Sequence, residues 1–141
     1  GHIDVDLSHI ELEGSGLGVP DWKTSVEFEI LGGGQPPANV EFGNLVASPN
    51  YQIKYLNKDV FLGWAWPCGA CCPEMTLRIL VAVTGDDGKG NELSGSTESF
   101  LTHSCPSTGI VSVGVEVIHP QLPDGQNKAK LWFRFIVKSW C

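Results

Sequence analysis

The stretch KLWFRFIVK, Lys130–Lys138, alternates between two kinds of side chain. One set is apolar and consists of Leu131, Phe133, Phe135 and Val137. The other set contains three cations and Trp132. Because successive side chains of a strand point to opposite faces of a sheet, this period of two predicts a β-strand with one buried face. We expect the apolar set to face a core and Trp132 to lie on the opposite face.

The same alternation recurs along the rest of the chain. It is found at Ile3–Leu7, Ile10–Leu12, Val26–Ile30, Val40–Phe42, Tyr51–Tyr55, Val60–Trp66, Met75–Val83, Thr97–Thr102 and Val111–Val117. The phase shifts by one residue between Leu7 and Ile10, which predicts a β-bulge near Ser8 and His9. Met75–Val83 is apolar at both parities, which predicts a central strand of a sheet.

Turn signals separate these runs. They are Gly32–Pro37, Asn57–Asp59, Gly85–Asn91 and Pro123–Gly125. Asp-Gly is a strong hairpin signal, so a hairpin is expected at Gly85–Asn91. Eight or nine strands predict an all-β fold, an antiparallel two-sheet β-sandwich of jelly-roll or immunoglobulin-like type. We expect residues 1–141 to form a single β-sandwich domain, because no linker or repeat divides the chain.

Composition excludes two classes of partner. The 141 residues carry a formal net charge of −7, so a polyanion such as nucleic acid would be repelled. No apolar run reaches the roughly 20 residues of a membrane-spanning helix. The chain starts Gly1-His2 rather than with Met, which indicates cleavage of a tag or a leader, and His2 is therefore assigned no role.

Five cysteines raise the question of disulfides: Cys68, Cys71, Cys72, Cys105 and Cys141. Cys72 occupies the position where c-type haem attachment requires histidine, which excludes that cofactor. Adjacent Cys71 and Cys72 point to opposite sides of an extended chain. We therefore expect one bond from this cluster to Cys105 and one to Cys141, with one cysteine left over. Two disulfides indicate a secreted or cell-surface protein.

Zinc is the alternative to disulfides. Cys68 and Cys71 have the spacing of a zinc knuckle, and His103 and Cys105 share one strand face. Together these four side chains would make a Cys3His site. The second pair departs from the usual knuckle spacing, so disulfides are preferred and no cofactor is expected.

Calcium is less favoured than zinc. The loop that contains Asp86, Asp87, Asn91 and Glu92 is acidic, but Gly88 and Gly90 fall where an EF-hand supplies side-chain ligands. A solvated hairpin tip is the preferred interpretation of this loop.

Catalysis has little support in the sequence. Ser104 lies beside His103, but the Gly-x-Ser-x-Gly elbow is absent. Glu27 and Glu29 share an outer strand face at a spacing that suits paired carboxylates, yet no cleft is implied. We expect no catalytic residues and a protein that is not an enzyme.

The first functional hypothesis is a non-catalytic extracellular module that binds carbohydrate or protein. An exposed Trp132 between Lys130 and Arg134 could stack on a sugar ring or a partner's side chain. Trp64 and Trp66 share a strand face and are weaker candidates for the same surface. Alternatively, Trp132 covers its own sheet beneath the aliphatic parts of Lys130 and Arg134.

The second hypothesis is a self-assembling structural subunit of a surface filament or coat. The alternating segment Ile3–Leu7 could add to the sheet edge of a neighbouring copy, giving a homo-oligomer. The unpaired cysteine could then cross-link subunits.

Overall fold

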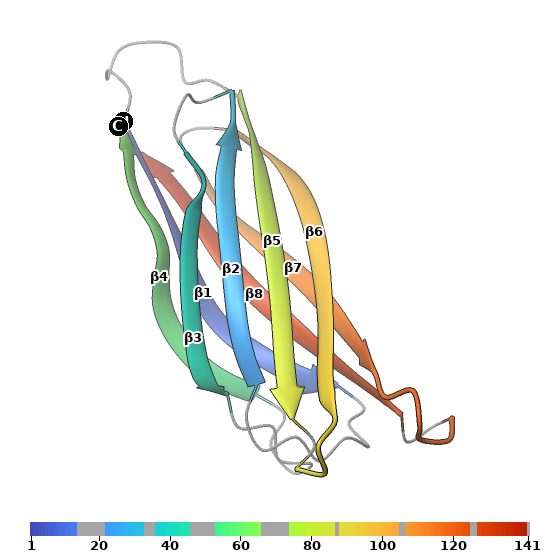
Figure 1. The fold of residues 1–141 in the computed structure, drawn as a ribbon. Coiled ribbons are helices and arrows are strands. Elements are labelled where there is room, and N and C mark those ends of the chain that lie inside the picture. Colours follow the sequence, from blue (N-terminus) through green and yellow to red (C-terminus); the bar gives the residue numbers. More distant parts are fainter. Residues whose placement is uncertain are drawn as a thin grey trace.

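The period-two pattern is realised as β-strands in a computed structural model of the chain (Figure 1). The structure describes residues 1–13, 22–32, 36–45, 53–65, 74–86, 88–104, 107–124 and 127–140. The strands are β1 (His2–Glu13), β2 (Trp22–Leu31), β3 (Ala38–Leu45), β4 (Ile53–Ala65), β5 (Glu74–Asp86), β6 (Glu92–Ser104), β7 (Ser107–Ile118) and β8 (Lys128–Trp140). The described segments include no helix with the length and apolarity needed to cross a bilayer.

The strands form two antiparallel sheets that face each other (Figure 1). The first sheet has the order β4-β1-β8-β7 and the second has the order β3-β2-β5-β6. The predicted two-sheet sandwich is therefore confirmed. In the immunoglobulin fold the first two strands share a sheet, whereas here β1 and β2 lie in different sheets.

The core lies between the sheets and is built from one parity of each strand. On β8 the inward set is the apolar set of Lys130–Lys138, and none of its members is more than 2% exposed. Trp22 and Phe28 of β2 are the largest buried side chains among the described residues of the second sheet. Fully burying one such side chain stabilises the fold by roughly 1.5–3 kcal/mol. The alternating pattern therefore favours the fold that places the apolar parity of every strand between the two sheets. The prediction that β5 is a central strand is confirmed, because it lies between β2 and β6.

A β-bulge divides β1, as its sequence predicts. Leu7 pairs with Phe135 and His9 pairs with Arg134, so Ser8 is an extra residue on β1 relative to β8. The bulge explains how residues 3, 5 and 7 and then Ile10 all point into the core.

The predicted turn at Asn57–Asp59 is wrong. β4 runs without a break from Ile53 to Ala65. Its register against β1 moves from Leu7–Lys58 to His9–Tyr55, which leaves one more residue on β4 than on β1. Asn57 adopts a φ of +46°, a conformation that asparagine tolerates better than most residues. Asn57, a residue common in turns, therefore allows the extra residue of β4 to be accommodated within the strand.

The two sheets approach closely where β6 faces β7. Thr97 Oγ1 donates a hydrogen bond of 2.7 Å to the carbonyl oxygen of Gly114. A Cβ at Gly95 would lie 2.4 Å from the carbonyl oxygen of Glu116, closer than any real contact. Glycine at residue 95 is thus required by the distance between the two backbones.

β1 is an interior strand and is paired along both of its edges, with β4 and with β8. Ile3–Leu7 therefore does not form a sheet edge in this structure. Strand addition to a neighbouring copy would require β1 to leave its own sheet.

Candidate binding site

An open depression lies on the outer face of the first sheet. Its volume is about 440 Å³, and its lining comes from β1, β8 and β7. The lining residues are His9, Glu11, Glu13, Ser112, Trp132 and Arg134. An indole ring, two carboxyl groups, a guanidinium, an imidazole and a hydroxyl thus meet on one surface.

Strand register positions these groups in rows across the sheet. His9 of β1 pairs with Arg134 of β8, which pairs on its other side with Ser112 of β7. In the next row Glu11 pairs with Trp132, which pairs with Gly114. The extra residue Ser8 reverses the parity of β1, which places His9 on the outer face. The bulge predicted from the sequence is therefore what aims His9 at this site.

Trp132 is held at both edges of its indole ring. Its Nε1 donates a hydrogen bond of 2.6 Å to Glu13 Oε2 on β1. The opposite edge lies against β7, because a Cβ at Gly114 would come within 2.8 Å of Trp132 Cζ3. The Lys130 ammonium lies over the ring, 4.4 Å from its centroid, within the range of a cation–π interaction. The ring is therefore pre-positioned along the sheet surface and half-buried.

The structure brings the predicted Trp132, Lys130 and Arg134 together on one face. The side chain of Trp64 and the whole of Trp66 lie outside the described residues. Glu13, Glu11, His9 and Ser112 were not assigned to this site from the sequence. The alternation in the sequence indicates that their side chains point outward. Their proximity to Trp132 depends on which strands flank β8, which the sequence alone does not give.

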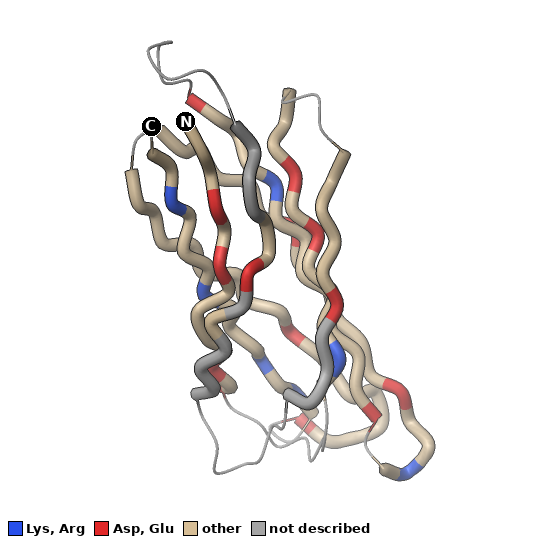
Figure 2. The backbone as a smooth tube through the Cα atoms, turned by 90° about the vertical axis from the view of Figure 1, so that its left-hand side faces the viewer, with Lys and Arg blue, Asp and Glu red and all other residues tan. Residues whose placement is uncertain are grey.

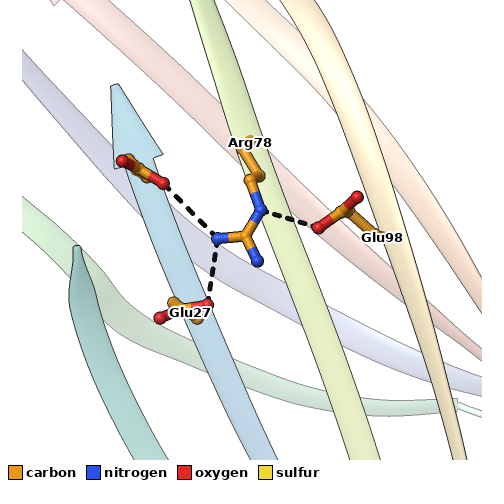
Figure 3. Close-up of polar contacts among 4 residues, drawn as sticks. Glu27, Arg78 and Glu98 are labelled. Atoms are coloured by element: carbon orange, nitrogen blue, oxygen red, sulfur yellow. Dashed lines mark hydrogen bonds and ion pairs between the residues drawn. The ribbon is translucent and has the colours of Figure 1, made fainter. Parts of the chain in front are cut away.

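A separate polar cluster occupies the outer face of the second sheet (Figure 3). Arg78 of β5 forms ion pairs with Glu27 at 3.0 Å, Glu98 at 2.7 Å and Glu29 at 3.5 Å. These hydrogen bonds, with Glu98 first, raise the pKa of Arg78 above its ordinary value. Both carboxylates that the sequence suggested as a catalytic pair are thus engaged by a cation, and the cluster links β2, β5 and β6.

Two carboxyl groups also meet on the first sheet. Asp6 of β1 pairs with Asp59 of β4. Burial raises the pKa of Asp6, and the hydrogen bond and charge of Asp59 add to that effect. Lys138 opposes the shift. This pair is a local source of repulsion when both groups are ionised.

His103 lies between the sheets with only 4% of its surface exposed. Its Nε2 is 2.7 Å from Ser139 Oγ and 3.5 Å from Ser107 Oγ. Burial lowers the pKa of His103 below its ordinary value of 6.5, which favours the neutral ring. His103, the histidine of the alternative zinc site, is thus hydrogen-bonded to Ser139 in this structure.

The predicted cysteine sites fall outside the described residues. These are Cys68, Cys71, Cys72, Cys105 and Cys141. The disulfides and the zinc alternative therefore stay predictions. In the described ranges no group of three or more His, Cys, Asp or Glu side chains could hold a metal ion.

The acidic hairpin loop is described in part. Asp86 Oδ1 accepts a hydrogen bond of 2.7 Å from the backbone N–H of Gly88, which closes the turn between β5 and β6. Gly88 and Gly90 have φ values of +77° and +87°, a region that glycine adopts without strain. Asp87 lies outside the described residues.

Comparison with known proteins adds no relative: no protein-family model, no curated protein and no solved structure matches the chain.

Proposed function

We propose that this chain is a non-catalytic extracellular module that binds carbohydrate or protein through the depression around Trp132. The observation that carries the proposal is the pre-positioned indole ring, bonded to Glu13 at one edge and lying against Gly114 at the other. A ring that is already fixed loses little conformational freedom when a ligand stacks on it.

The groups around the ring support recognition of a polar ligand. Arg134 and Glu11 line the same depression and offer hydrogen-bond donors and acceptors. Binding sites of this kind combine an apolar plane with a few convergent polar groups. Lys130 lies over one face of the ring, so a ligand that stacks on that face must first displace its ammonium group.

The test is a screen of the purified chain against immobilised glycans and secreted proteins, followed by measurement of Kd for each ligand found. Trp132→Ala should weaken binding at least about tenfold, the loss of one favourable aromatic contact. Arg134→Ala, an exposed position, should also weaken binding. Phe100→Ala is the matched control, because Phe100 is 58% exposed on the outer face of the second sheet. Equal affinity of the parent and of Trp132→Ala for every ligand would contradict the proposal.

The extracellular setting depends on the cysteines rather than on the described fold. Two disulfides would support it, because such bonds persist in an oxidising compartment. Assembly by strand addition and the Cys68-Cys71-His103-Cys105 zinc site remain alternatives. Size-exclusion chromatography with light scattering tests the first, and metal analysis of the purified chain tests the second.

A further inference from the structure

The outer face of β8 carries a longer surface than the depression alone. Its outward side chains alternate between cations and large apolar groups. They are Lys130, Trp132, Arg134, Ile136, Lys138 and Trp140, here called the β8 strip. At about 3.4 Å per residue, Trp132 and Trp140 are about 27 Å apart along the strand.

Trp140 forms a second aromatic position on this strip. It is 42% exposed, so a large part of its indole surface faces solvent. The ring of His2, its register partner on β1, lies 5.7 Å from the Trp140 ring at an interplanar angle of 31°. Between the two tryptophans, Ile136 pairs with Ile110 of β7, which is 66% exposed. Apolar surface therefore recurs along the strip at regular spacing.

We propose that the β8 strip binds one extended, uncharged polysaccharide chain that lies along β8 and stacks on Trp132 and Trp140. The inference rests on the proposed function and names its ligand class. Sugar rings have apolar faces that stack on aromatic rings and hydroxyl edges that need donors and acceptors, and the strip offers both in alternation.

Charge on the neighbouring strand argues against a charged polymer. Figure 2 shows acidic segments along β1 beside basic segments of β8. Asp4 is the register partner of Lys138, and Glu13 is the register partner of Lys130. The outward carboxylates of β1 thus offset the cations of β8 locally, and the whole chain carries a net charge of −7. A polyanion would meet these carboxylates along its whole length.

The spacing of the charges also argues against a protein partner. The buried centre of a protein interface is depleted of charged residues. On the β8 strip a cation stands at every second outward position between Lys130 and Lys138. Desolvating these cations and the carboxylates beside them against a protein surface would be unfavourable, whereas a hydrated glycan leaves them in contact with water.

The experiment is isothermal titration calorimetry of the full chain with uncharged oligosaccharides of increasing length, from disaccharide to octasaccharide. Gluco-, galacto-, manno- and N-acetylglucosamine series serve as probes, and heparin oligosaccharides serve as the anionic comparison. Affinity for the matching series should rise at least about tenfold from the shortest to the longest member, as one further aromatic contact is made. Trp140→Ala should bind the shortest member as the parent does and lose the gain with length. Far-ultraviolet circular dichroism verifies that each variant keeps its strands.

The outcomes separate this inference from the proposed function. In one outcome, Trp132→Ala abolishes glycan binding while neither chain length nor Trp140→Ala affects it. That result overturns the extended site and leaves the proposed binding function standing. Binding of a protein through Trp132 with no affinity for any oligosaccharide, or tighter binding of heparin, overturns the ligand class alone. Affinity that survives Trp132→Ala for every ligand overturns the proposed function.

Discussion

His103 is a buried side chain whose protonation state contributes to the free energy of unfolding. Its pKa is lowered in the folded chain because burial disfavours the charged ring. The unfolded chain therefore binds a proton more readily than the folded chain does. The stability that this histidine contributes is fully present above about pH 6.5 and is lost as the pH falls toward its folded-state pKa.

We expect the urea concentration at the unfolding midpoint to decrease when the pH is lowered from 7.5 to 5. This decrease should be smaller in His103→Gln. Equal pH dependence in the parent and in His103→Gln would show that other groups account for it.

The raised pKa of Asp6 changes the stability of the fold with pH in the opposite direction. The folded-state pKa of Asp6 is raised, first by burial and then by Asp59, so the stability it contributes is present below about pH 3.8 and is lost as the pH rises. Asp59→Asn removes one charge and keeps a hydrogen-bond partner. It should raise the melting temperature at pH 7, by an amount that corresponds to at most about 1 kcal/mol at this surface.

The gain from Asp59→Asn should disappear at pH 3, because the raised pKa of Asp6 keeps its carboxyl group protonated there and no repulsion remains to be relieved. Asp124→Asn is the matched control, because Asp124 is exposed and lies between β7 and β8. It should leave the melting temperature unchanged at both pH values. A gain of the same size at pH 3 would contradict the electrostatic explanation.

Among the elements, the β6–β7 contact is the most sensitive to added volume. Gly95→Ala would place its Cβ 2.4 Å from the backbone oxygen of Glu116, and a backbone atom cannot move aside as a flexible side chain can. We expect it to destabilise the fold by about 1–3 kcal/mol, the range found for overpacking. Chemical denaturation monitored by tryptophan fluorescence measures the change.

Gly109→Ala supplies the comparison for Gly95→Ala. Its Cβ would lie 3.6 Å from His103 Nδ1, which is ordinary contact, so its effect on stability should be clearly smaller. If both alanine variants destabilised the chain equally, the close approach of β6 and β7 would not be the cause.

Gly114→Ala tests the binding site instead of the fold. The new Cβ would meet the side chains of Trp132 and Lys130, both of which can move. The variant should therefore remain folded, shift the tryptophan emission and weaken ligand binding. Unchanged emission and affinity would contradict the role of Gly114 in holding the indole ring.

The elements differ in how well the sequence predicted them. β5 and β8 were predicted because long apolar alternation has one structural solution at a sandwich core. β4 was divided in two, because Asn57 is a turn former and its use inside a strand depends on the partner strand. Local sequence therefore indicates where side chains point, but the register of a bulged strand requires its neighbour.

The same reasoning applies to the candidate site. Lys130, Trp132 and Arg134 were placed on one face because they share the parity of one strand. The bond from Trp132 to Glu13 joins residues 119 positions apart, and only the strand order of the sheet reveals it. Trp140 has the same parity as Trp132 and could have been found from the sequence.

At the scale of the whole molecule, the redox state of the five cysteines would indicate whether the chain works in an oxidising compartment. We expect the intact mass of the native chain under non-reducing conditions to be lower by four hydrogen atoms, the signature of two disulfides. Reduction with a strong thiol should restore that mass. A fully reduced mass with one added zinc ion would instead support the Cys3His site and contradict the disulfides.

The pairing of β1 with β8 has a consequence for synthesis. β1 is synthesised before the other described strands, and one of its two partner strands, β8, is the last of them in chain order. Its apolar side chains, among them Ile3, Val5 and Leu7, therefore lack their β8 partner until β8 has been synthesised. Pairings so distant in sequence slow folding to milliseconds or seconds, so the apolar side of β1 stays open to aggregation for longer than that of a strand paired with its neighbour in sequence.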